Sequence, residues 1–256
     1  MYLIFKREEN IINNSPKVTI FGLHGLGGSA NSITGLLQYL DPKQFEIIPI
    51  ALPGSRFEKY HHEKTLDDFA DFVVDKMKSY HKKNFYLLGF SFGGLIAHLI
   101  SENYHKYFTD ELRGAIIWAA PFLGLTPFLN LFYSSLNLTA DILNKPGNLE
   151  KVMKTANALK IGLNRGDTED LILTDKKSLA RGMKIIKSTK YSFHSDLRRN
   201  YIFDEKDIFV KSKTYDYVQK HLQSKNSKAI LLKSGGHFSS AEAFHRVNKL
   251  IADFCR

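Results

Sequence analysis

A serine stands between two glycines in the stretch Gly89-Phe90-Ser91-Phe92-Gly93, which matches the pattern G-x-S-x-G. An apolar run typical of a strand precedes the stretch, and a run typical of a helix follows it. In that setting the serine occupies a tight turn, where side chains two residues away on either side would collide. The turn exposes the hydroxyl, and the helix N-terminus directs free N–H groups toward an anion. We interpret Ser91 as a candidate nucleophile for acyl transfer; the alternative is a bystander serine in a glycine-softened turn.

A nucleophilic serine needs a base, and the chain has ten histidines. His237 follows the last predicted strand in a glycine-containing loop, Ser234-Gly-Gly-His237. From such a loop an imidazole can reach a serine at the carboxyl ends of a parallel sheet. We therefore predict that His237 is the general base. Four other histidines lie in polar segments, where exposure is expected: His61, His62, His81 and His105. Two more, His98 and His245, lie inside predicted helices.

The base needs a carboxylate that orients it and stabilises the imidazolium. Acidic residues follow the strand that lies between the serine and the histidine in the chain, so the order Ser…Asp…His is available. Asp207 is the first candidate because it lies in the turn beyond the strand, and Asp204 at the strand end is the alternate. A solvated acidic turn without function is the competing interpretation.

A glycine-rich loop, His24-Gly25-Leu26-Gly27-Gly28, follows the first predicted strand. Acyl transfer produces an oxyanion, which needs two positioned N–H donors. We predict that the backbone N–H groups of Leu26 and Phe92 supply them. Such a loop could cradle a phosphate instead, but it has neither the G-x-G-x-x-G spacing nor the lysine of a P-loop. His24 is expected to organise the loop through hydrogen bonds rather than to catalyse.

Strand-like and helix-like stretches alternate along the chain, which predicts an α/β fold with a mostly parallel sheet flanked by helices. The predicted strands are 17–24, 45–52, 85–90, 112–120, 200–204 and 229–233. The predicted helices between and after them are 32–40, 65–80, 93–104, 214–222 and 240–254.

The alternation stops between residues 122 and 196, where the sequence indicates helices and no strand. We interpret 122–196 as a helical cap inserted into a core domain made of 1–121 and 197–256. Because insertions above a sheet shape pockets, the apolar part of the cap is a candidate pocket wall, and packing of the cap on the body is the alternative. The candidate substrate-binding residues are Phe122, Leu125, Phe128, Leu129, Phe132 and Leu136.

Composition narrows the class of protein. The 256 residues carry a formal net charge of +10, but the basic residues are scattered and no nucleic-acid motif accompanies them, so no nucleic-acid partner is expected. The single cysteine, Cys255, allows no intrachain disulfide, and no signal peptide or membrane span is evident, which predicts a cytoplasmic protein. Contact of the apolar cap with a membrane surface is a weaker alternative. The oligomeric state is left open.

Together these motifs resemble those of a serine hydrolase of the α/β-hydrolase superfamily, of the carboxylesterase or lipase type with a helical cap. The resemblance implies that Ser91 attacks an acyl or aryl ester, that His237 takes its proton, and that Asp207 orients His237. It implies an acyl-enzyme intermediate, a small-molecule ester substrate, and no metal or organic cofactor. In this family a stretch Asp-x-Pro-Gly-His-Gly-x-Ser commonly follows the second parallel strand. The corresponding residues 51–58 read Ala-Leu-Pro-Gly-Ser-Arg-Phe-Glu here, without the initial acid or the second glycine. The same triad serves thioesterases, acyltransferases, amidases and C–C bond hydrolases, and a non-catalytic ligand binder is the alternative from another class.

Overall fold

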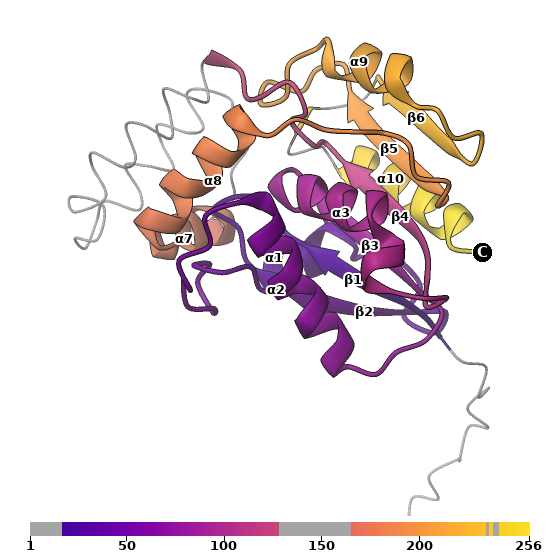
Figure 1. The fold of residues 1–256 in the computed structure, drawn as a ribbon, viewed down its shortest axis with the longest axis horizontal. Coiled ribbons are helices and arrows are strands. Elements are labelled where there is room, and N and C mark those ends of the chain that lie inside the picture. The colour runs from indigo at the N-terminus through magenta and orange to yellow at the C-terminus, as the bar shows by residue number, and fades with distance from the viewer. Residues whose placement is uncertain (1–16, 128–164, 234–235, 238–240) are drawn as a thin grey trace, which may run out of the picture.

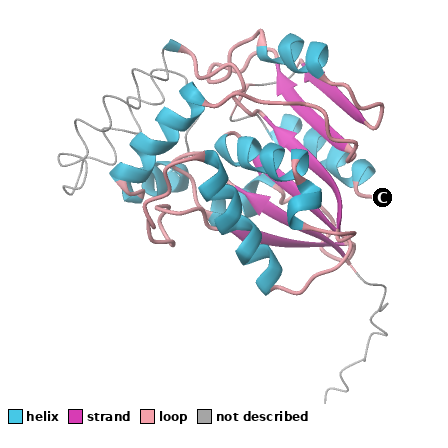
Figure 2. Ribbon diagram, in the orientation of Figure 1, coloured by secondary structure: helices cyan, strands magenta, loops and turns pink. Residues whose placement is uncertain are grey.

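A six-stranded sheet forms the centre of the computed structural model, which describes residues 17–127, 165–233, 236–237 and 241–256 (Figures 1 and 2). Every pair of neighbouring strands in it is parallel, and the strand order is β2-β1-β3-β4-β5-β6. The strands are β1 (Val18–Leu23), β2 (Phe45–Ile50), β3 (Phe85–Phe90), β4 (Leu112–Trp118), β5 (Arg199–Asp204) and β6 (Ser227–Leu232).

Helices alternate with these strands, as a parallel sheet requires for its crossovers. A hydrogen bond from Asn248 Nδ2 to Leu36 O (2.8 Å) joins α10 to α1, and the rings of Phe69 and Phe92 join α2 to α3. Figure 1 shows α3 in front of the sheet and α10 behind it. The helices are α1 (Ala30–Leu36), α2 (Leu66–Ser79), α3 (Phe92–Glu102), α4 (Tyr104–Tyr107), α7 (Arg165–Leu173), α8 (Lys176–Ser188), α9 (Thr214–His221) and α10 (Ala241–Phe254).

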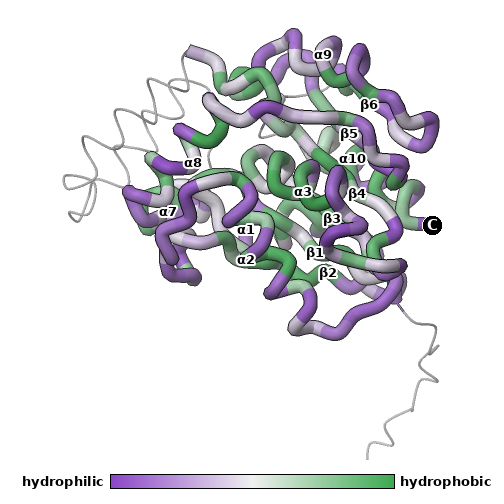
Figure 3. Tube along the Cα trace, viewed as in Figure 1, coloured by the Kyte–Doolittle hydropathy of each residue, from purple (hydrophilic) through white to green (hydrophobic). Residues whose placement is uncertain are grey.

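The core lies along the central strands. All six residues of β3 are buried, which suits a strand covered by helices on both faces. The edge strands β2 and β6 are only partly buried. Figure 3 shows the hydrophobic residues gathered along the inner strands and α3, with hydrophilic residues on the outer loops. Because side chains fill the interior around the sheet, we expect the candidate active site in the loops at the ends of the strands.

The predicted α/β class with a parallel sheet is confirmed, and the six strands lie within two residues of their predicted limits. The helix predicted over 93–104 ends at Glu102, and the separate short helix α4 follows it. Helix α1 starts at Ala30, earlier than predicted, because the Ser29 side chain caps its first turn. No strand was expected near residue 125, but Leu125 forms an isolated antiparallel bridge with Val210.

Two helices of the 122–196 segment lie in the described part of the chain. In Figure 1, α7 and α8 lie beyond one end of the sheet, next to the loops that lead from β1 and β2. One face of α8 is buried, formed by Ser178, Leu179, Gly182, Met183, Ile185 and Ile186. This spacing is that of a helix packed on one side. None of the helices in the described ranges combines the length and the apolar composition of a membrane span.

Candidate active site

Ser91 lies in the sharp turn between β3 and α3. Its backbone has φ 53° and ψ −115°, a left-handed conformation that is rare for a residue with a side chain. A Cβ atom at Gly89 would lie 2.1 Å from Gly93 O, and one at Gly93 would lie 2.5 Å from His24 O. Backbone atoms cannot move aside at these distances, so both flanking positions require glycine. The sequence pattern around Ser91 therefore has a steric cause in the fold.

His237 and Asp207 form a hydrogen-bonded pair. The distance from His237 Nδ1 to Asp207 Oδ2 is 2.7 Å, and the two side chains are 3% and 4% exposed. The second oxygen of Asp207 accepts hydrogen bonds from the backbone N–H groups of Phe209 (2.7 Å) and Val210 (3.0 Å). Because the carboxylate only accepts, Nδ1 must carry the hydrogen, and Nε2 is left with its lone pair when the ring is neutral. The carboxylate is thus fixed by the backbone and orients the imidazole.

Two aromatic rings hold the imidazole plane. The Phe209 ring stacks on His237 with 4.5 Å between ring centroids and 15° between planes. The Phe90 ring lies 4.8 Å from the same imidazole. Since Phe90 directly precedes Ser91, this contact brings the His237–Asp207 pair to the Ser91 turn.

Asp204, the alternate acid, has a different place in the structure. Its Oδ1 accepts hydrogen bonds from the backbone N–H groups of Gly236 and Lys206, each at 2.9 Å. Gly236 has φ +85°, which favours glycine. Asp204 therefore holds the backbone of the loop that carries His237, whereas Asp207 contacts the imidazole itself.

The predicted oxyanion donors lie beside the Ser91 turn. Phe92 is the first residue of α3, and an amide at that position has no acceptor inside its own helix. The loop after β1 is joined to this helix by a hydrogen bond from Gly93 N to His24 O (3.1 Å). A Cβ atom at Gly25 would lie 3.2 Å from Ser91 Cβ, so the residue before Leu26 is in contact with the serine. The loop that carries Leu26 and the start of α3 therefore lie side by side, both next to Ser91.

His24 organises the loop, as its position predicts. Its Nδ1 donates to Gly25 O (2.8 Å), and its Nε2 accepts from Leu52 N–H (3.0 Å) in the loop after β2. Complete burial lowers the pKa of His24 to about 4, so the ring is neutral and both nitrogens stay committed to these bonds.

The predicted pocket residues are described only in part. Phe122 is buried in an aromatic cluster with His98, Tyr191, Phe193 and Tyr201, which agrees with the packing alternative. Leu125 is also buried and pairs with Val210. The remaining candidates, Phe128, Leu129, Phe132 and Leu136, lie outside the described residues. The part of the chain that the structure describes contains no cluster of His, Cys, Asp and Glu suited to a metal ion.

A small hollow opens beside the predicted oxyanion loop, between Leu26, Phe92 and the start of α8 at Ser178. Ser55 lines it, and its buried hydroxyl has no hydrogen-bond partner among the described residues. Sequence reasoning did not single out Ser55, because a serine in a loop carries no signal of its own.

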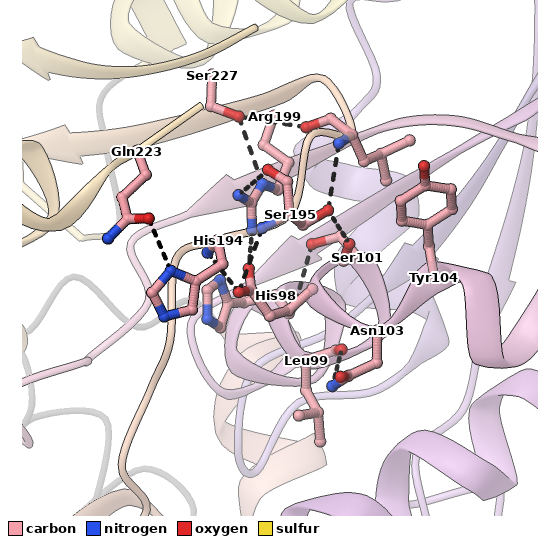
Figure 4. A network of polar contacts seen from close by, with 12 residues as sticks. His98, Leu99, Ser101, Asn103, Tyr104, His194, Ser195, Arg199, Gln223 and Ser227 are labelled. Atoms are coloured by element: carbon pink, nitrogen blue, oxygen red, sulfur yellow. Dashed lines mark hydrogen bonds and ion pairs between the residues drawn. The ribbon is translucent and has the colours of Figure 1, made fainter. Parts of the chain in front are cut away.

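A buried ion pair was also not predicted from the sequence; it belongs to the polar network around Arg199 in Figure 4. Arg199 at the start of β5 is fully buried and pairs with Glu102 at the end of α3. The backbone of 194–195 joins the network: His194 N donates to Glu102 Oε1 (2.5 Å), and Arg199 donates to Ser195 O (2.8 Å). The sequence gives little sign of this pair, because Arg199 stands beside Arg198 just before the predicted strand 200–204, where an exposed side chain is expected. The network joins the segment after α8 to α3, the helix that follows Ser91.

Comparisons with known proteins agree with the observed fold. A model of the family described as "alpha/beta hydrolase fold" matches residues 18–153, more than half of the chain. No curated protein matches the sequence.

Similar solved structures show the same fold at low sequence identity. A complex of an N-acyl homoserine lactonase has a TM-score of 0.73 at 17% identity, over 95% of this chain and 90% of that one. An esterase from Exiguobacterium antarcticum has a TM-score of 0.70 at 13% identity, over 93% and 91%. A bottromycin epimerase has a TM-score of 0.66 at 14% identity, over 94% and 92%. The fold is thus shared by enzymes with different reactions.

Proposed function

Because the chain belongs to the α/β-hydrolase fold family, we propose that it is a serine hydrolase that cleaves carboxylic esters, acyl or aryl, through Ser91, His237 and Asp207. The observation that carries the proposal is the buried His237–Asp207 pair, 2.7 Å apart, packed against the residue that precedes Ser91. A histidine so oriented can act as a general base, and a serine in a strained strand–helix turn is typical of a nucleophile.

The reaction has two steps in this proposal. Ser91 Oγ attacks the ester carbonyl and gives its proton to His237 Nε2, while Asp207 stabilises the imidazolium that forms. The N–H groups of Leu26 and Phe92 stabilise the oxyanion. His237 then protonates the departing alcohol, which leaves the acyl-enzyme. Water, activated by the same imidazole, attacks the acyl group and releases the acid and Ser91.

The ester class is supported by two of the similar structures, whose descriptions name a lactonase and an esterase. Both names describe cleavage of a carboxylic ester bond, cyclic or open. A carboxylate nucleophile would be needed for dehalogenase chemistry, and position 91 is a serine.

The test is hydrolysis of p-nitrophenyl esters from acetate to palmitate by the wild type, Ser91→Ala and Ser79→Ala. Ser79 is exposed at the end of α2, so its variant is the matched control. We expect the wild type and Ser79→Ala to hydrolyse at least one ester at equal rates and Ser91→Ala to lose about 10³-fold or more.

A fluorophosphonate probe separates the ways in which this proposal can fail. Labelling of Ser91 without ester hydrolysis would reject the ester class and retain the activated serine. Absence of both would reject the serine hydrolase and favour a ligand binder.

A further inference from the structure

Helix α8 contains a glycine in its interior, at a position where glycine disfavours a helix. Gly182 is buried, and a Cβ atom there would lie 2.4 Å from Leu26 Cδ1 and 3.2 Å from Leu26 Cδ2. The missing side chain therefore leaves a notch in α8 that the Leu26 side chain fills. Leu26 is the residue whose N–H is the proposed oxyanion donor of the β1 loop.

The next residue of the loop is held in the same manner. Gly27 has φ +80°, and a Cβ atom there would lie 2.4 Å from Leu171 Cδ1 of α7 and 3.8 Å from Leu179 Cδ1 of α8. Leu26 thus inserts into α8, while leucines of α7 and α8 insert against the loop backbone at Gly27. The peptide between Leu26 and Gly27 has contacts from both helices.

Hydrogen bonds fix the two helices over these loops. Ser29 Oγ donates to Asp170 Oδ2 of α7 (2.5 Å), and Arg56 pairs with the other oxygen of Asp170 (3.2 Å). At the start of α8, Ser178 Oγ donates to Pro53 O (2.7 Å), and Asp175 N donates to Gly54 O (2.7 Å). The notch at Gly182 therefore has a defined place relative to Leu26.

These contacts extend the proposed function and depend on it: we propose that Gly182 is a positioning residue for the oxyanion hole, because its notch holds Leu26 and thereby fixes the Leu26 N–H. The backbone of a glycine-rich loop is conformationally free, whereas an oxyanion is stabilised only by N–H donors that are already positioned at hydrogen-bond distance. The side chain of Leu26 is the part of this loop that packs against α8 and is held by it.

The test exchanges the projecting side chain between the two partners. Gly182→Leu fills the notch, Leu26→Ala removes the side chain that fills it, and the double variant restores the total volume. Gly35→Leu is the matched control, since it makes the same change in an exposed helical position with no heavy atom within 4 Å. Gly182→Ala is a milder form for the case in which leucine prevents folding. Thermal unfolding checks that each variant is folded.

The readouts are kcat and KM for the best ester of the series, and the Ki of an aryl trifluoromethyl ketone, whose tetrahedral adduct with Ser91 carries an oxyanion. We expect Gly182→Leu to lower kcat about 30-fold and to raise the Ki of the ketone by the same factor, while KM changes by less than about 3-fold. Leu26→Ala should also lower kcat, by about 10-fold, because its N–H is no longer held, and the double variant should recover to within about 3-fold of the wild type. Gly35→Leu should equal the wild type.

A folded Gly182→Leu variant with unchanged kcat, or a double variant no better than Gly182→Leu, would overturn this inference and leave the proposed function intact. A rise in KM with unchanged kcat would also overturn it, since this indicates blocked access rather than a displaced donor. A wild type without Ser91-dependent hydrolysis would overturn the proposed function and, with it, the role of Gly182.

Discussion

Asp204 and Asp207 belong to one turn but contact different parts of the candidate site. Asp207 accepts from the imidazole of His237, whereas Asp204 accepts from the backbone N–H of Gly236. The two carboxylates can therefore be separated by changing each to the amide of the same shape.

We expect Asp207→Asn to lower kcat by about 10⁴-fold, because an amide in this place favours the wrong imidazole tautomer. Asp204→Asn keeps a carbonyl oxygen that can accept from Gly236 N–H, so its kcat should fall less than about 10-fold. The measurement is kcat for both variants on the same ester. Equal losses would contradict the separate roles that the two hydrogen-bond patterns indicate.

At the scale of elements, α7 is attached to the rest of the protein through a buried carboxylate. Asp170 is 4% exposed and accepts from Ser29 Oγ, the hydroxyl that also caps α1. Arg56 is its cationic partner. The contact thus couples a helix of the 122–196 segment to the loop that follows β1.

We expect Asp170→Ala to destabilise this attachment by about 1–3 kcal/mol, since Ser29 Oγ is left buried without its acceptor. Hydrogen exchange should become about 10-fold faster or more in α7 and in 27–31, with the amides of β3 and β4 unchanged. The exposed Asp75→Ala in α2 serves as control. Exchange that increases equally across the sheet would show global loss of stability instead of local detachment.

At the scale of the whole molecule, two buried histidines make stability depend on pH. Burial lowers the pKa of His24 to about 4 and that of His98 to about 3. His98 also donates to or accepts from Tyr201 Oη at 2.9 Å, deep between α3 and β5. Both rings therefore stay neutral in the folded protein well below the pKa of about 6.5 that they have when unfolded.

Below about pH 6.5 the unfolded chain binds protons at these two positions and the folded protein does not, so stability falls as pH falls. The stability is fully present above about pH 6.5 and decreases by about 4 kcal/mol between pH 8 and pH 5. This window lies above the range in which Glu46, Asp68 and other carboxylates with lowered pKa values titrate. Urea unfolding at both pH values measures the loss, and His98→Gln should reduce it by about half. Equal stability at pH 8 and pH 5 would contradict the buried neutral state of both rings.

The sequence by itself determined the six strands, most of the helices outside 122–196, and the turn that carries Ser91. Strand and helix signals are local, because side-chain periodicity over six to fourteen residues reports which face is buried. The glycine at 89 was predictable from the turn alone, since a Cβ atom there would meet Gly93 O of the same strand–helix turn. The glycine at 93 has a tertiary cause, since a Cβ atom there would meet the backbone of Leu23 and His24.

Only the tertiary structure decided contacts between distant segments. The separation of Asp207 from Asp204, the pairing of Arg199 with Glu102 and the fit of Leu26 into Gly182 each join residues that no local pattern relates. Their partners depend on how loops and helices pack over the sheet, where one side-chain volume or one hydrogen bond selects among several candidates. Composition and periodicity carry no record of that selection, because residues with the same local pattern can pack against different neighbours.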